Sequence, residues 1–122
     1  MTEDNNESFM EISGNGNKYW KNKQGKYHRL DGPAVERADG SKDWWVDGKR
    51  HRTDGPAVER AYGLKRWYVH DKLHRLDGPA IEDANGSKYW WVDGINLTEE
   101  EFNYWSKDWN EEKEIMFGLT YS

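Results

Sequence analysis

HRLDGPAVERADGSKDWWVDGKR, residues 28–50, decides the fold of this chain, because it recurs twice immediately downstream. The copies are HRTDGPAVERAYGLKRWYVHDKL at 51–73 and HRLDGPAIEDANGSKYWWVDGIN at 74–96. The three segments align without a gap at a period of 23, and 12 of the 23 positions are identical in all three. Such self-similarity is typical of repeat architectures, in which each unit packs against its neighbours. We therefore predict a tandem array.

The array continues towards the N-terminus in a degenerate form. GNKYW at 16–20 matches GSKYW at 86–90, so we expect a degenerate unit over 9–27. The predicted organisation is a disordered acidic tail at 1–8, an array at 9–97 and an end segment at 98–122.

Each unit predicts two short strands. The Lys-x-Trp-aromatic-Val segments are rich in aromatic and β-branched residues, and the Pro-Ala-Val/Ile-Glu segments place proline where a strand tolerates it. The expected strands are 33–36 and 42–47, 56–59 and 65–70, and 79–82 and 88–93. Asp-Gly follows the first and third aromatic strands and is a strong hairpin signal. His70-Asp71 replaces it in the middle unit, so we expect a looser turn there.

The composition fits a thin sheet better than a thick core. Leu, Ile, Val and Phe number 18 of 122 residues, about 15%, whereas eight Trp and seven Tyr supply apolar area. We predict a mainly β protein, an elongated single-layer antiparallel sheet of tandem 23-residue hairpin repeats. The absence of cysteine excludes disulfides and thiolate chemistry. The acidic balance and the lack of a long apolar run lead us to expect a cytoplasmic protein with neither nucleic acid nor membrane as partner.

The C-terminal segment predicts a cap on the last repeat. Thr98 and Glu101 have capping-box spacing, and they open an expected helix over about 99–113. Phe102, Trp105 and Trp109 form one aromatic stripe on it, which Met116 would continue. Beyond the helix, apolar residues alternate over 115–121, which predicts a terminal strand.

The repeat motif resembles the MORN repeat. The pattern aromatic-x-x-x-Gly-Lys-x-His, a strand and then Asp-Gly-Ser is closest to units of small bacteriophage and bacterial proteins that carry His-Arg-x-Asp-Gly-Pro-Ala. The matching residues are Trp44, Gly48, Lys49, His51, Asp39, Gly40 and Ser41. Over about 9–97, the resemblance implies successive hairpins that serve interaction and not catalysis. Arg52 and Asp54 stand where the typical unit has glycine, so phospholipid binding is not expected.

The tripled histidines and aspartates look like metal-binding or acid–base residues. Repeated one hairpin apart, they would be separated by about 9–10 Å, too far for two imidazoles to share one zinc ion. We predict structural ladders, no enzymatic activity, no metal and no cofactor. The ladders are His28, His51 and His74; Asp31, Asp54 and Asp77; and Trp44, Trp67 and Trp90. The arginine after each histidine is expected to pair with the aspartate of its motif or with the following glutamate, as in Arg29 with Asp31 or Glu36.

The second aromatic face is the predicted binding surface. It combines aromatic residues with neighbours that vary between units, as protein-binding surfaces do. Its members are Trp45, Tyr68, Trp91, Asp43, Arg66, Tyr89, Asp47, His70 and Asp93.

These features predict a module that binds a protein partner. By analogy with the bacteriophage relatives, that partner is a host bacterial protein, such as a defence protein that the chain inhibits. A homodimer through a sheet edge or the C-terminal segment is a further expectation. Two alternatives stay open: a carbohydrate- or choline-binding aromatic repeat, and an acidic mimic of nucleic acid.

Overall fold

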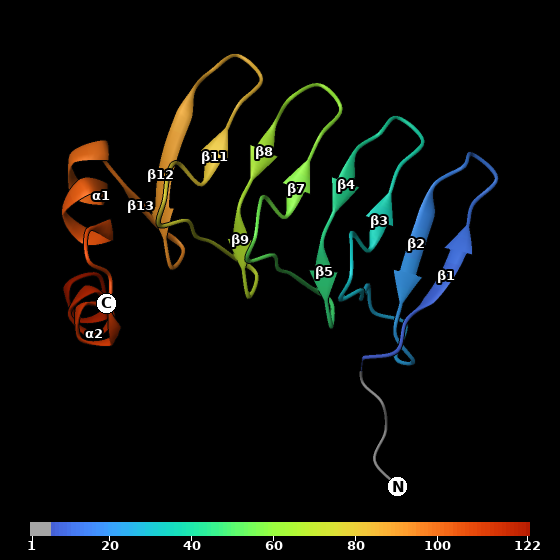
Figure 1. Cartoon of the computed structure of the whole chain (residues 1–122), viewed down its shortest axis with the longest axis horizontal. Coiled ribbons are helices and arrows are strands. Elements are labelled where there is room, and N and C mark those ends of the chain that lie inside the picture. Colours follow the sequence, from blue (N-terminus) through green and yellow to red (C-terminus); the bar gives the residue numbers. More distant parts are fainter. Residues whose placement is uncertain (1–5) are drawn as a thin grey trace, which may run out of the picture.

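The computed structural model describes residues 6–122 and is a row of antiparallel hairpins that ends in two helices (Figure 1). Nine strands form one long sheet in the order β1-β2-β3-β4-β7-β8-β11-β12-β13, and two short hairpins, β5-β6 and β9-β10, extend below it. The predicted mainly β architecture is therefore confirmed. Residues 1–5 of the predicted tail lie outside the described residues.

The strands are short and follow the repeat. The first hairpin is β1 (Phe9–Ile12) with β2 (Lys18–Lys21). The next unit holds β3 (Val35–Glu36), β4 (Lys42–Asp43), β5 (Trp45–Val46) and β6 (Lys49–Arg50). The middle unit holds β7 (Val58–Glu59), β8 (Lys65–Arg66), β9 (Tyr68–Val69) and β10 (Lys72–Leu73). The last holds β11 (Ile81–Glu82), β12 (Lys88–Val92) and β13 (Ile95–Leu97).

Each expected aromatic strand is divided in the first two units. The chain pairs with the long sheet up to Asp43, and from Trp45 it forms a separate short hairpin with Lys49–Arg50. At the division the Trp44 N–H still donates to the carbonyl oxygen of Ala57 in the next unit, at 2.8 Å. The unit is therefore two hairpins in tandem, with the second shorter than the first.

The turns at the short hairpins have the same geometry in all units. Both turn residues have positive φ, with 50° and 78° at Asp47 and Gly48. His70 and Asp71 adopt 49° and 68°, so the looser turn expected in the middle unit is wrong. The flanking pairs Tyr68–Leu73 and Val69–Lys72 determine the turn, and two non-glycine residues accept left-handed backbone to keep it.

The buried residues form a thin line along the sheet. Ala34, Ala57 and Ala80, the alanines of the repeated Gly-Pro-Ala, are completely buried, and Val35 and Val58 are nearly so. A larger apolar cluster exists at the C-terminal end, where Val92 and Leu97 meet the helices. The sheet relies on its aromatic residues for the rest of its packing.

The C-terminal segment is two helices and not one helix with a strand. α1 (Glu99–Ser106) ends at Lys107, Asp108 has a positive φ of 54°, and α2 (Glu111–Thr120) starts anew with Asn110 as its N-cap. The predicted single helix over 99–113 and strand over 115–121 are therefore wrong. The Asn110 side chain accepts the Lys113 N–H at 2.8 Å, which stabilises a second helix start.

The predicted start of the cap is confirmed. The Thr98 hydroxyl accepts the Glu101 N–H, and the Glu101 carboxylate accepts the Thr98 N–H, which completes the capping box. Phe102 and Trp105 are buried against the last hairpin, and Trp109 packs on the same cluster from the link between the helices. The described residues include no helix of the length and apolarity that a membrane crossing requires.

Candidate binding surface

The histidine ladder binds the short hairpins to their units. In each unit the histidine Nδ1 accepts the backbone N–H of the first turn residue at 3.0 Å, as His28 does from Asp47. The other two pairs are His51 with His70 and His74 with Asp93. An Nδ1 that accepts a hydrogen bond cannot carry a proton. The Nδ1 atoms of the ladder histidines therefore act as acceptors for the turn backbone.

Burial favours the neutral imidazole at His51 and His74. Desolvation lowers the pKa of His51, and the nearby His70, whose ring centroid is 4.4 Å away, lowers this pKa further. Desolvation also lowers the pKa of His74, although the carboxylates of Asp93 and Glu114 act in the opposite direction. Within residues 6–122, no three histidine, aspartate or glutamate side chains are grouped so that they could hold a metal ion.

The arginine ladder connects each unit to the one before it. The Arg52 guanidinium lies 3.8 Å from the centre of the Trp44 ring, donates to the Pro56 carbonyl at 2.9 Å and pairs with Asp54 at 2.9 Å. Arg29 on Trp20 and Arg75 on Trp67 repeat this arrangement. The predicted pairing with the aspartate is confirmed in all three units. The pairing with the glutamate is closest between Arg75 and Glu82, at 2.8 Å.

The glycine of the motif provides room for the guanidinium. A Cβ placed on Gly55 would lie 2.8 Å from Arg52 Cζ, and the equivalent distances at Gly32 and Gly78 are 2.9 and 2.8 Å. Every residue type of the repeated His-Arg-x-Asp-Gly-Pro-Ala, apart from the variable position, is thus engaged within the fold.

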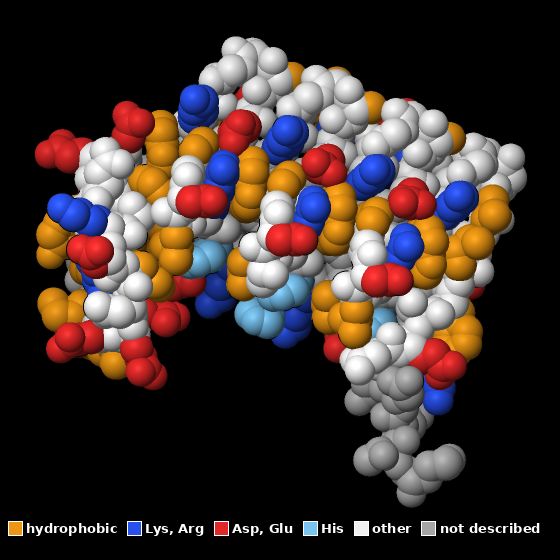
Figure 2. Space-filling model, in the orientation of Figure 1, with side chains coloured by type: hydrophobic (Ala, Val, Ile, Leu, Met, Phe, Trp, Pro, Cys, Tyr) orange, Lys and Arg blue, Asp and Glu red, His pale blue; other side chains and the backbone are white. Residues whose placement is uncertain are grey.

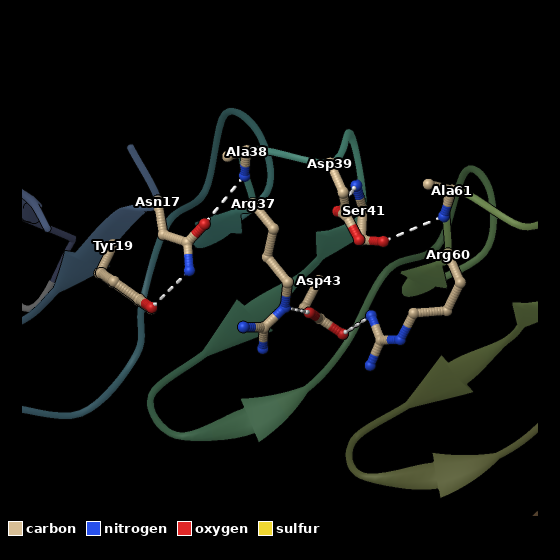
Figure 3. A network of polar contacts seen from close by, with 9 residues as sticks. All are labelled: Asn17, Tyr19, Arg37, Ala38, Asp39, Ser41, Asp43, Arg60 and Ala61. Carbon is tan, nitrogen blue, oxygen red and sulfur yellow. Dashed lines mark hydrogen bonds and ion pairs between the residues drawn. The ribbon is translucent and has the colours of Figure 1, made fainter. Parts of the chain in front are cut away.

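Asp43 does not belong to an exposed face. It is 1% exposed, and its carboxylate lies between two arginines, 2.9 Å from Arg60 and 3.8 Å from Arg37 (Figure 3). Its position in the predicted binding face is therefore wrong, because neighbouring hairpins close over it. Beside it, the Ser41 hydroxyl accepts the Ala61 N–H at 3.0 Å, which ties the same two hairpins together.

The equivalent contact one unit earlier uses an amide. The Asn17 side-chain oxygen accepts the Ala38 N–H at 2.8 Å, and its nitrogen donates to the Tyr19 hydroxyl at 3.1 Å (Figure 3). In the loop that joins β3 to β4, the Asp39 carboxylate accepts the Ser41 N–H, and this hydrogen bond lowers the pKa of Asp39. Polar side chains of the upper loops therefore also join units.

The other residues of the predicted face are partly accessible. Trp45 and Tyr68 are half-buried and face Arg50, which lies 5.0 and 5.4 Å from their ring centres. Trp91 and Arg66 are half-buried as well, and Tyr89 is 44% exposed. The turn residues differ in exposure: Asp47 and His70 are exposed, and Asp93 is half-buried.

Two similar grooves lie between successive units. Each has a volume of about 570 Å³; one is lined by Trp44, Arg52 and Asp54, and the next by Trp67, Arg75 and Asp77. In Figure 2, rows of basic, acidic and hydrophobic side chains repeat from one hairpin to the next. The guanidinium covers one face of each of these tryptophans, so the grooves combine charged side chains with partly covered aromatic rings.

Exposed apolar side chains gather at the two ends of the array. Phe9, Met10 and Ile12 of β1 are about half exposed, at 47–60%, and β1 is paired on one side only among the described strands. At the other end the exposed residues are Tyr104 on α1 and Ile115, Met116 and Leu119 on α2. Sequence reasoning placed 115–121 in a strand and so missed this helical surface.

Comparisons of the chain with models of protein families, with curated proteins and with solved structures found no significant match. The candidate surface therefore has to be judged from its own geometry.

Proposed function

We propose that this chain is a MORN-like, non-enzymatic repeat module that binds a protein partner. The proposal rests on one observation: the invariant and the varied residues of the repeat have different roles. The invariant polar side chains hold the units together, as Arg52 does on Trp44, whereas varied and apolar side chains remain at the surface. Exposed apolar clusters on an otherwise polar protein are typical of interaction sites.

A host bacterial protein is the partner class that we propose, with inhibition of that protein as the consequence. The support is the resemblance of the motif to units of small bacteriophage and bacterial proteins. A homodimer through the edge of β1 is a second form of association, which is favoured because this edge pairs with no other strand of residues 6–122. Sedimentation analysis of the purified chain distinguishes a monomer from that dimer.

Two other functions have less support in the contacts. A sugar or choline group would need an open aromatic face, but an arginine covers one face of Trp20, Trp44 and Trp67. A mimic of nucleic acid would need a continuous acidic stripe, whereas basic and acidic side chains alternate along the sheet (Figure 2).

Affinity capture from a bacterial lysate tests the proposed function. We expect the immobilised full chain to retain one stoichiometric protein. The double variant His70→Ala/Tyr89→Ala, which changes two accessible residues of the sheet, measures what the sheet contributes. Retention on a choline resin or a glycan array, without a captured protein, would favour the small-ligand alternative.

A further inference from the structure

One face of α2 is apolar and uncovered among the described residues. Ile115, Met116 and Leu119 are 61%, 56% and 74% exposed and lie on one side of the helix, at i, i+1 and i+4. Phe117 points the other way and is 2% exposed in the cluster beneath the helix. The helix therefore has two apolar sides, of which the fold uses one.

Phe117 anchors α2 in the aromatic cluster at the end of the array. Its ring meets Trp105 edge-on at 5.2 Å, Trp109 at 5.7 Å and Tyr121 at 4.7 Å. The Trp105 Nε1–H also donates to the Tyr121 hydroxyl at 3.2 Å. The outer residues of α2 contribute nothing to this cluster, so the stability of the cap does not explain them.

The border of the outer face is acidic. Glu111 and Glu112 are exposed in the first turn of α2, and the last turn has no basic residue. Glu114 lies on the inner side of the helix, where its carboxylate acts on His74. The cation within the helix, Lys113, is turned away from the border. Its ammonium donates to the carbonyl oxygens of Tyr104, at 2.7 Å, and of Lys107.

Next to this face is a groove between the two helices. It has a volume of about 560 Å³ and is lined by Tyr104, Asp108, Glu112 and Met116, among others. Met116 and Tyr104 extend the apolar surface into the groove, and its charged lining consists of Asp108 and Glu112 together with Lys107 and Lys113. On the left of Figure 2, acidic, hydrophobic and some basic side chains lie over the helices.

We propose that α2 is the anchor by which the chain holds its protein partner, and that the partner offers an apolar groove bordered by lysine or arginine. This inference rests on the proposed function. An amphipathic helix that lays its apolar face into an apolar groove is a common mode of recognition. The acidic border selects a basic rim by charge complementarity. A second α2 is a poor match, because it would bring carboxylates against carboxylates.

Photo-crosslinking in bacterial cells tests this assignment. Benzoylphenylalanine replaces Leu119 in one full-length variant and Tyr62 in another; Tyr62 is 68% exposed and belongs to a loop of the sheet. We expect a crosslinked product with another protein from position 119, and none from position 62. The crosslinked partner peptide should contain apolar residues flanked by lysine or arginine.

Affinity capture provides the matched comparison. We expect Ile115→Ser/Leu119→Ser to weaken retention of the crosslinked protein at least about tenfold. Glu111→Lys/Glu112→Lys should weaken it severalfold, mainly through slower association. Tyr62→Ser should leave retention unchanged. Since all these side chains are exposed, unchanged thermal unfolding will show that each variant is folded.

Three other results of the crosslinking experiment would contradict the role of α2. Products from position 62 without products from position 119 would overturn the role of α2 and leave the proposed function standing. A product of twice the mass of the chain would replace the heterologous partner with a second copy and overturn the assignment. No product from either position, together with no captured protein, would overturn the proposed function as well.

Discussion

Replacing Gly55 with alanine is a direct test of how the repeats are joined. The added Cβ would lie 2.8 Å from Arg52 Cζ, too close for two carbon atoms. Gly55 does not have positive φ, so the substitution adds no backbone strain of its own. The guanidinium has to shift, and we expect this shift to weaken its contacts with Trp44 and with the Pro56 carbonyl oxygen.

The contacts of Arg52 give the size of the effect. Its position over Trp44 is worth about 1 kcal/mol, and its hydrogen bond to Pro56, from a charged donor, about 1.5 kcal/mol. The pair with Asp54 adds little, because that carboxylate is 84% exposed. Allowing for partial relaxation, we expect Gly55→Ala to reduce the free energy of unfolding by about 2 kcal/mol, measured by urea titration with tryptophan fluorescence.

A double-mutant cycle separates this cause from others. If the guanidinium is what the new methyl group displaces, Gly55→Ala should cost almost nothing in the Arg52→Ala background. Gly14→Ala is the matched control, because no atom lies within 4 Å of the added Cβ and the φ of Gly14 is not positive. Fully additive costs for Gly55→Ala and Arg52→Ala would refute the proposed packing.

Three further predictions concern turns, pH and the cap. Asp71→Gly should raise the free energy of unfolding by about 1 kcal/mol, because glycine accepts the φ of 68°. Gly94→Asp, the reverse change at the equivalent turn, should lower the free energy of unfolding by a similar amount. If both variants changed the free energy of unfolding in the same direction, the explanation by backbone strain would be wrong. Stability should decrease as the pH falls below about 6.5, the unfolded pKa of histidine. The folded pKa values of His51 and His74 are lowered, so the unfolded chain binds protons before the folded chain does. Replacing both histidines with asparagine should make the midpoint of urea unfolding depend less on pH between 7.5 and 5.5. Thr98→Ala should cost about 1 kcal/mol, seen as a lower melting temperature, and an unchanged value would mean that the capping box adds no stability.

The sequence was sufficient for the parts of the fold that the repeat determines locally. Identical spacing of turn residues predicted the hairpins, and the pairing of each motif arginine with a nearby aspartate followed from two residues of separation, as in Arg29 and Asp31. The capping box at Thr98 was equally local. These features depend on neighbours in the chain, which a single sequence displays.

Asp43 shows why part of the candidate site was not predictable. Strand alternation placed it on the outer face with Trp45, but the strand divides at Trp44, and the alternation does not continue across the division. Its burial also depends on Arg60, which comes from the next hairpin. No local pattern records that contact.

The end of the chain was mispredicted because its pattern fits two structures. Ile115, Phe117, Leu119 and Tyr121 alternate as a strand would, but 117 and 121 are also one helical turn apart, as are 115 and 119. In the helix the first pair turns inward and the second outward. The N-cap signal of Asn110, followed by acidic residues, was the observation that could have decided between them.

The contact between Trp44 and Arg52 has a consequence for how this protein can change over generations. Because Trp67 meets Arg75 in the same way, loss of residues 51–73 would bring Trp44 to Arg75 and keep this contact, although Asp43 would then meet Asp83 in place of Arg60. Gain or loss of one 23-residue repeat would therefore lengthen or shorten the sheet in whole units. Such a change would leave the first hairpin and the helical end intact, so that the reach of the molecule can vary while the groups at its two ends stay the same.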